Sequence, residues 1–266
     1  MARVRLPAAA GSFYPASPSA LTTEVDGWLE QARVSDRDRP AALVVPHAGY
    51  VYSGPVAAAA YATLRAFKGR TPRVLLVGPC HFLPLRGLAY PDVDVLCTPL
   101  GEVPLDEDLR ERAAKFRQVS ASTEAHEAEH SLEVQLPFLQ RVLGAFRVLP
   151  LVVGSASGEE VEQVLDALWA PDVLPVISSD LSHYLPYEDA READRETAER
   201  VLSLDGPLDG GSACGAAGIS GLMLAARKRG LRPRLLDLRS SGDTAGGLDE
   251  VVGYGAFAFY PPGTGS

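Results

Sequence analysis

The decisive stretch of the sequence is Leu75-Leu76-Val77-Gly78-Pro79-Cys80-His81, a short apolar run that ends at a histidine. Two further runs end in a similar way, Val44-Val45-Pro46-His47 and Val176-Ile177-Ser178-Ser179-Asp180-Leu181-Ser182-His183. A fourth run, Leu235–Leu238, leads into Ser240-Ser241-Gly242-Asp243. Apolar runs without polar alternation are typical of strands that are covered on both faces. Because ligands of open α/β sheets bind beyond the carboxyl ends of the strands, the four runs predict a polar site at one sheet edge.

Strand-like runs alternate with helical patterns along the chain. The predicted strands are Ala42–Val45, Val74–Val77, Val93–Cys97, Arg147–Val153, Leu174–Ile177, Arg234–Leu238 and Val251–Phe259. The predicted helices are Pro18–Ala32, Gly54–Phe67, Asp106–Arg117, Ser131–Leu143, Gly158–Trp169, Tyr187–Leu204 and Ala216–Arg229. The alternation predicts an α/β sandwich with a mostly parallel or mixed central sheet flanked by helices. Pro137 should kink the helix that contains it or mark a boundary.

The composition is that of an ordinary globular protein with an acidic charge. Of 266 residues, 46% are hydrophobic and 22% are charged, which is typical of a folded chain. No repeat or long linker divides the sequence, so we expect one domain over residues 1–266, with 261–266 as a frayed tail. The formal charge of −9 predicts that neither nucleic acid nor an anionic membrane surface is a partner.

The sequence also indicates the cellular compartment in which we expect the protein. No apolar run approaches the ~18 residues of a membrane span, and the N-terminal residues lack the apolar core of a signal peptide. The three cysteines form neither a CxxC pair nor a disulfide framework, as is usual inside cells. We therefore expect a cytoplasmic protein.

The five histidines all fall in predicted loops or at the ends of predicted elements. A single histidine after a strand is often a capping or loop residue, but four strand ends that each deliver His or Asp indicate a shared site. His130 and His183 are candidates for general acid–base catalysis, since imidazole titrates near neutral pH. Asp180 is expected to orient a histidine ring by accepting its hydrogen bond, or else to cap the following turn.

A different chemistry is suggested by one local motif, His126-Glu127-Ala128-Glu129-His130, which matches HExxH and also its inversion, HxxEH. Zinc hydrolases need both histidines on one face of a helix, with the glutamate as general base. The residues that follow, 131–137, are typical of a helix start and not of its continuation. In so acidic a stretch a chance match is easy, so an HExxH-type zinc hydrolase is the third functional alternative.

The candidates for the substrate pocket are Tyr50, Glu133 and Cys214. Cys214 belongs to the segment Gly210-Gly211-Ser212-Ala213-Cys214-Gly215, which leads into a predicted helix. We expect it to be a pocket wall more than a nucleophile, and the glycine-rich loop could equally bind an anion. Tyr50 either lines the site or packs under its helix.

A series of short motifs runs through nearly the whole chain. In order they are Ala10-Gly11-Ser12-Phe13-Tyr14-Pro15, Pro46-His47-Ala48-Gly49-Tyr50, Gly78-Pro79-Cys80-His81, Glu129-His130-Ser131-Leu132-Glu133-Val134-Gln135-Leu136-Pro137, Ser178-Ser179-Asp180-Leu181-Ser182-His183, Ser240-Ser241-Gly242-Asp243 and Val252-Gly253-Tyr254. Each motif alone is modest, but the ordered set is specific. It resembles the Memo family, whose bacterial and archaeal members are named AmmeMemoRadiSam system protein B.

The resemblance implies a fold and a metal site. The Memo family is similar in fold to class III extradiol dioxygenases of the LigB type, which use non-haem Fe(II). His47 and His81 match the family's metal positions, with Asp180 and His183 nearby. The third ligand of animal members is a cysteine, and we expect Asp243 at the matching position, which is a departure. Two histidines with one carboxylate suit Fe(II), so Fe(II) is the expected cofactor, with Cu and Zn as alternatives.

These features favour a metal-dependent oxidoreductase that acts on a small-molecule or peptide substrate. The alternative is a binding module that kept the fold and lost turnover, because animal members are linked to phosphopeptide recognition. The acidic charge argues against an anionic ligand. The resemblance also implies a modification pathway shared with a radical-SAM protein and an AMMECR-type protein, and it leaves the oligomeric state open.

Overall fold

The computed structural model describes residues 2–33, 38–70 and 73–263. The strands are β1 (Val4–Arg5), β2 (Ala42–Val45), β3 (Arg73–Pro79), β4 (Leu88–Tyr90), β5 (Val95–Thr98), β6 (Gly101–Pro104), β7 (Val119–Ala121), β8 (Arg147–Val153), β9 (Val173–Ser178), β10 (His183–Leu185), β11 (Arg232–Ser240) and β12 (Val251–Tyr260). The helices are α1 (Pro18–Gln31), α2 (Tyr50–Ala62), α3 (Glu107–Ala113), α4 (Glu124–Glu127), α5 (Leu136–Leu143), α6 (Gly158–Leu168), α7 (Tyr187–Ser203) and α8 (Ala216–Arg229), and the 3-10 helices are η1 (Arg65–Phe67), η2 (Glu133–Gln135) and η3 (Ser241–Asp243).

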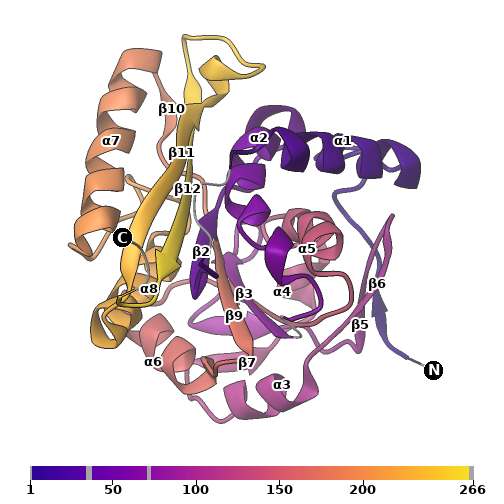
Figure 1. Cartoon of the computed structure of the whole chain (residues 1–266). Coiled ribbons are helices and arrows are strands. Elements are labelled where there is room, and N and C mark those ends of the chain that lie inside the picture. The colour runs from indigo at the N-terminus through magenta and orange to yellow at the C-terminus, as the bar shows by residue number, and fades with distance from the viewer. Residues whose placement is uncertain (1, 34–37, 71–72, 264–266) are drawn as a thin grey trace.

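A large mixed sheet lies at the centre of the molecule and confirms the predicted α/β class (Figure 1). Its strand order is β10-β12-β2-β9-β3-β8-β4-β7, and β11 pairs with β12. The neighbours β2, β9, β3 and β8 are parallel. At either end of this parallel group, β12 joins β2 and β4 joins β8 in antiparallel pairs. The parallel group therefore has a single carboxyl edge, and His47, His81 and Asp180 follow its strands.

Helices cover both faces of the sheet (Figure 1). Leu43 and Leu76 belong to the core formed with α1, α2 and α5, whereas Val44 and Leu75 belong to the core formed with α6 and α8. All four side chains are fully buried. Burial on both faces explains why these strands are apolar at every position and lack polar alternation.

Several predicted elements differ in detail. The run 93–97 contributes to β5, which pairs with β1 and β6 in a small separate sheet. The segment 131–143 divides into η2 and α5, and Pro137 lies in the first turn of α5, where its missing N–H leaves no helical hydrogen bond unmade. Of the predicted tail 261–266, residues 264–266 lie outside the described ranges. Within those ranges, no helix has the length and apolar character that a membrane span requires.

Candidate metal site

Three of the predicted site residues come together at the carboxyl edge of the sheet. His47 follows β2, His81 follows β3 and Asp180 follows β9. Because β9 lies between β2 and β3, the three segments leave the sheet side by side. This is the edge at which open α/β sheets bind ligands.

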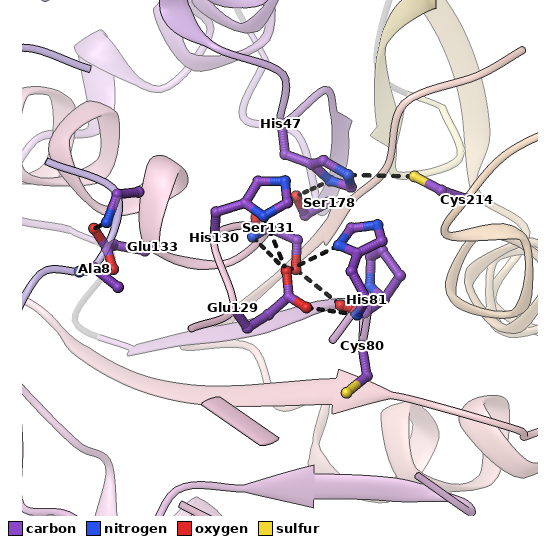
Figure 2. Close-up of polar contacts among 12 residues, drawn as sticks. Ala8, His47, Cys80, His81, Glu129, His130, Ser131, Glu133, Ser178 and Cys214 are labelled. Atoms are coloured by element: carbon purple, nitrogen blue, oxygen red, sulfur yellow. Dashed lines mark hydrogen bonds and ion pairs between the residues drawn. The ribbon is translucent and has the colours of Figure 1, made fainter. Parts of the chain in front are cut away.

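Cys214 completes a cluster with two of these residues (Figure 2). The ligand atoms of His47, His81 and Cys214 all lie within 4.8 Å of one another. His47 Nε2 is 3.3 Å from Cys214 Sγ, and the two imidazole rings are 5.2 Å apart at their centroids. Two imidazole nitrogens and a sulfur at this spacing form a set of donors that could hold a metal ion.

The loop before α8 is held against the end of β9, and this contact places Cys214. The Asp180 N–H donates to Cys214 Sγ at 3.3 Å, and the Cys214 N–H donates to the Asp180 carbonyl at 3.3 Å. A Cβ at Gly215 would lie 2.7 Å from the Cβ of Ser179. Glycine at this position therefore allows the close approach that brings the sulfur to the site.

A buried serine determines which nitrogen of His47 carries the proton. The Ser178 hydroxyl donates to the Ser131 carbonyl at 2.6 Å and accepts a hydrogen bond from Gln135 Nε2 at 2.8 Å. Since a hydroxyl has one hydrogen to donate, it must accept at its 2.9 Å contact with His47 Nδ1. The neutral ring therefore has its proton on Nδ1, and its Nε2 lone pair faces Cys214 Sγ.

Glu129 lies beneath the site and is almost fully buried. It accepts hydrogen bonds from the His81 N–H at 2.6 Å, His81 Nδ1 at 3.0 Å and the Ser131 N–H at 2.9 Å. Burial alone would raise the pKa of this carboxyl, but the hydrogen bonds from His81 and Ser131 outweigh it and lower the pKa to about 2. The carboxylate is therefore ionised at neutral pH.

His47 and the Cys214 thiol are neutral in the protein without metal. Burial lowers the pKa of His47 to about 3, with a smaller contribution from His81. Burial also raises the pKa of the Cys214 thiol to about 12, with the Asp180 charge as the next cause. Metal binding to the sulfur would release the thiol proton, so affinity should increase with pH.

A cavity of about 860 Å³ opens beside the cluster. All three predicted catalytic residues line it, namely His130, His183 and Asp180. Aromatic side chains line it as well, namely Phe13, Tyr52 and Tyr184. Phe13 stacks on the His130 ring at 4.1 Å between centroids. Burial lowers the pKa of His130 to about 4, with His47 as the next cause.

Asp180 acts on His47 through the backbone. Its Oδ1 accepts from the His47 N–H at 2.7 Å and from the Ala48 N–H at 3.3 Å. The other carboxylate oxygen lies 4.0 Å from His47 Nε2, which is beyond hydrogen-bond distance. For His47, Asp180 therefore positions the segment that carries the ring and makes no hydrogen bond to the ring itself.

The structure does not bring Asp243 together with the two histidines. One carboxylate oxygen accepts from the Tyr187 hydroxyl, and the other accepts from the Ser240 N–H at 2.8 Å and the Ser240 hydroxyl at 3.1 Å. Asp243 lines a different cavity, beside Arg191 of α7. The loop at the end of β11 turns its carboxylate towards α7, so Cys214 occupies the position that was expected for Asp243.

Two of the predicted pocket residues pack elsewhere. Tyr50 is buried and donates to the Val134 carbonyl at 2.6 Å, while Tyr52 lines the cavity. Glu133 is buried, accepts from Arg5 Nη1 at 2.6 Å, and also accepts from the Ala8 N–H at 2.8 Å. Figure 2 shows Glu133 and Ala8 away from the histidine cluster. Of the three pocket candidates, only Cys214 therefore lines the cavity.

The HExxH motif does not form the helix that zinc hydrolases require. The helix α4 ends at Glu127, and His126 Nε2 lies 2.9 Å from the Ala89 carbonyl. His130 instead lines the cavity. The two histidines of the motif therefore point to different places, which removes the geometric basis of the zinc-hydrolase alternative.

The sequence did not identify Glu129 as the partner of His81 or Ser178 as the partner of His47. Both lie inside quoted motifs, and Glu129 directly precedes His130. An acidic residue next to a loop histidine could have indicated Glu129 as a histidine partner. Glu124 and Glu127 lie in the same stretch, however, and are equally good candidates by sequence. Which carboxylate turns inward is determined by packing.

The fold and the site together define an α/β protein with a possible metal site at the carboxyl edge of its sheet. Comparison with known proteins then identifies the family: the chain belongs to the Memo-like proteins, whose family model matches residues 5–258. A MEMO1 family protein of Caldivirga maquilingensis is 36% identical over 96% of this chain and 99% of that protein. Another, from Methanosarcina barkeri, is 38% identical over 95% of this chain and 98% of that protein.

Solved structures contain the same fold. The crystal structure of an uncharacterized protein of Escherichia coli K12 matches 81% of this chain and 99% of its own chain, with a TM-score of 0.55. The sequence identity is 17%, so this likeness shows the fold alone.

Proposed function

We propose that this protein is a metal-dependent oxidoreductase whose metal ion is held by His47, His81 and Cys214. The observation that carries the proposal is the convergence of three donor atoms within 4.8 Å in the wall of a cavity of about 860 Å³. Three protein ligands beside a cavity leave an open coordination position, which is the arrangement of catalytic metal sites. The cavity has the size of a small-molecule or peptide side-chain site.

The donor set decides which ions suit the site. Two imidazoles and a thiolate are softer than the two histidines and one carboxylate expected from the sequence, and they suit copper, zinc and iron. Cys214 thus moves the preference from the expected Fe(II) towards the more thiophilic alternatives, Cu and Zn. When bound, an iron or copper ion would supply redox chemistry at the open position.

The chain itself supplies groups that can move protons. The His130 ring lies 5.0 Å from the His81 ring and 5.6 Å from the His47 ring at their centroids. Because burial lowers the pKa of His130 to about 4, this imidazole is neutral at pH 7 and offers a nitrogen lone pair to a proton donor of a substrate in the cavity. His183 lines the same cavity and is the second candidate for proton transfer.

The cavity does not favour the phosphopeptide alternative. None of the described residues that line it is a lysine or an arginine. Proteins recognise phosphate groups mainly through arginine and lysine. Asp180 and Glu250 are among the lining residues, so a neutral or cationic ligand fits the charge of the cavity better.

The test is a metal titration followed by a turnover assay. Chelator-treated protein is titrated anaerobically with Fe(II), Cu(I) and Zn(II) by calorimetry, and we expect one ion per chain. The variant Cys214→Ser should lose this binding. Cys97→Ser is the matched control, because Cys97 lies in the small sheet formed by β1, β5 and β6.

Turnover is measured as oxygen uptake by the iron- or copper-loaded protein with catechols as probe substrates. Uptake that requires His130 supports an oxidoreductase. Binding of zinc alone, with no oxygen uptake by any loaded form, would overturn the redox part of the proposal. Absence of any metal binding by the wild-type chain would overturn all of it.

A further inference from the structure

Glu129 is a buried carboxylate that contacts the site without belonging to the proposed ligand set. Its side chain is 1% exposed, and Figure 2 shows it below the rings of His81 and His130. Its Oε1 atom lies 3.0 Å from His81 Nδ1 and 3.5 Å from His130 Nδ1. One oxygen atom therefore faces the same nitrogen of two different imidazoles.

The hydrogen bonds of this carboxylate determine the tautomer of His81. An ionised carboxylate can only accept hydrogen bonds, so His81 Nδ1 must carry the proton at this contact. The neutral ring then has its lone pair on Nε2. The two nitrogens of an imidazole point in different directions, so a ring that donates from Nδ1 to Glu129 presents Nε2 elsewhere.

Glu129 also affects the tautomer of His130. Its Nδ1 atom is buried and makes no hydrogen bond, and the carboxylate of Glu129 lies 3.5 Å away. The stacked ring of Phe13 restricts how far this imidazole can turn. A negative oxygen near a buried Nδ1 favours the proton on that nitrogen, which leaves Nε2 of His130 as the proton acceptor.

We propose that Glu129 is a positioning residue that fixes His81 in its Nδ1–H tautomer and so makes Nε2 the metal-ligating atom. The inference rests on the proposed function, in which His81 is a ligand. Ser178 holds His47 in the same tautomer by accepting from its Nδ1. Two different acceptors thus prepare two histidines so that both offer Nε2 to one ion, alongside the sulfur of Cys214.

A rival reading is that His81, Glu129 and His130 hold a cation of their own, because their ligand atoms also lie within 4.8 Å of one another. The hydrogen bonds disfavour it. Backbone N–H groups of His81 and Ser131 already donate to the two carboxylate oxygens. A cation would face these donors, and it would have to replace the proton on His81 Nδ1. We therefore assign Glu129 to orientation and not to ligation.

The first experiment needs no variant and no metal. Nitrogen NMR of histidine-labelled metal-free protein, recorded at about pH 8 where histidines are neutral, reports which nitrogen of each ring is protonated. We expect His81 and His47 to carry the proton on Nδ1. A His81 ring protonated on Nε2 would overturn the proposal whatever the metal titrations show.

The second experiment compares Glu129→Gln with Glu127→Gln, a matched exposed neighbour in the same stretch. We expect Glu129→Gln to lose the Nδ1–H preference of His81 and to bind metal about 10–100-fold more weakly, the usual cost of removing a partner of a ligating histidine. Glu127→Gln should match the wild type in both measurements. Glu129→Asp, which keeps the charge on a shorter side chain, should recover part of the affinity.

The outcomes separate the two proposals. If the wild type binds no metal, the proposed function fails, and the NMR result still tests the tautomer. If the wild type binds one ion and Glu129→Gln binds it equally well, only the role of Glu129 fails. Binding of two ions by the wild type, with one lost in Glu129→Gln, would show that Glu129 is a ligand and would overturn its assignment to orientation. Should Glu129→Gln not fold, Glu129→Asp and the wild-type NMR spectrum remain decisive.

Discussion

The two edges of the central sheet use their polar residues in opposite ways. At the amino edge, Arg73 makes bonds of 2.6 Å to both oxygens of Asp106, and it also pairs with Asp108 at 2.6 Å and Asp172 at 3.6 Å. At the carboxyl edge, His47 is buried and Cys214 is half-buried, and both are neutral, with pKa values moved away from ionisation at pH 7. Paired charges hold the fold together, whereas neutral donors gathered beside a cavity are available to a ligand.

The sharpest test of this comparison is the removal of a donor at the carboxyl edge. We expect Cys214→Ala to weaken metal binding by more than about 100-fold, because loss of a ligand exceeds the ~10–100-fold cost of losing a supporting partner. The free energy of unfolding of the metal-free protein should change little. Calorimetric titration and urea unfolding measure the two quantities. Unchanged metal affinity would show that the sulfur is not a ligand.

The matching change at the amino edge should affect stability only. Asp106 is 3% exposed, and Arg73 is 19% exposed. Asp106 also caps α3 by accepting from the Leu109 N–H at 3.0 Å. We expect Asp106→Ala to lower the free energy of unfolding by about 2–3 kcal/mol, since a partly buried ion pair and a helix cap are both lost. Asp108→Ala, on an exposed partner, should cost less than about 1 kcal/mol. Metal affinity should be unchanged in both variants, and a loss of affinity in Asp106→Ala would contradict the division between the edges.

Buried neutral histidines should also make the fold sensitive to acid. Burial lowers the pKa of His126 to about 4, against about 6.5 in an unfolded chain. Above pH ~6.5 neither state binds the proton; as the pH falls towards 4, only the unfolded state binds it, so stability is lost. This group contributes a slope of up to ~1.4 kcal/mol per pH unit in that window. The slope, measured by urea unfolding at several pH values, should decrease in His126→Gln. An unchanged slope would remove His126 as a source of acid sensitivity.

The smallest effect is expected from Asp243. Its carboxylate is held by Tyr187 and Ser240 in a separate cavity, so Asp243→Ala should change metal affinity by less than about 3-fold, within the range of surface substitutions. The same titrations that measure Cys214→Ala provide the comparison. A large loss of affinity would mean that the loop at the end of β11 moves into the site when metal binds.

More of the fold than of the site could be predicted from the sequence. Runs such as Leu75–Val77 are apolar without alternation, and burial on both faces of a sheet accommodates them. The small sheet was not foreseen, because Val95 and Leu96 have the same strand-like composition as residues of the central sheet. Composition predicts a strand but does not name its partner, since pairing depends on contacts between distant segments.

The sequence by itself determined that His47, His81 and Asp180 would lie at one edge of the sheet, because each follows a buried strand and the carboxyl ends of parallel strands share an edge. That β9 lies between β2 and β3 was decided by the tertiary structure. Only the tertiary structure decided between Asp243 and Cys214. Both residues lie in loops, and the direction of a loop is set by the contacts it makes: Cys214 is drawn in by backbone hydrogen bonds to Asp180, while Asp243 is drawn away by Tyr187. The tautomers of His47 and His81 were likewise decided by folding, because Ser178 and Glu129 are distant from those rings in the chain and reach them only when the sheet has formed.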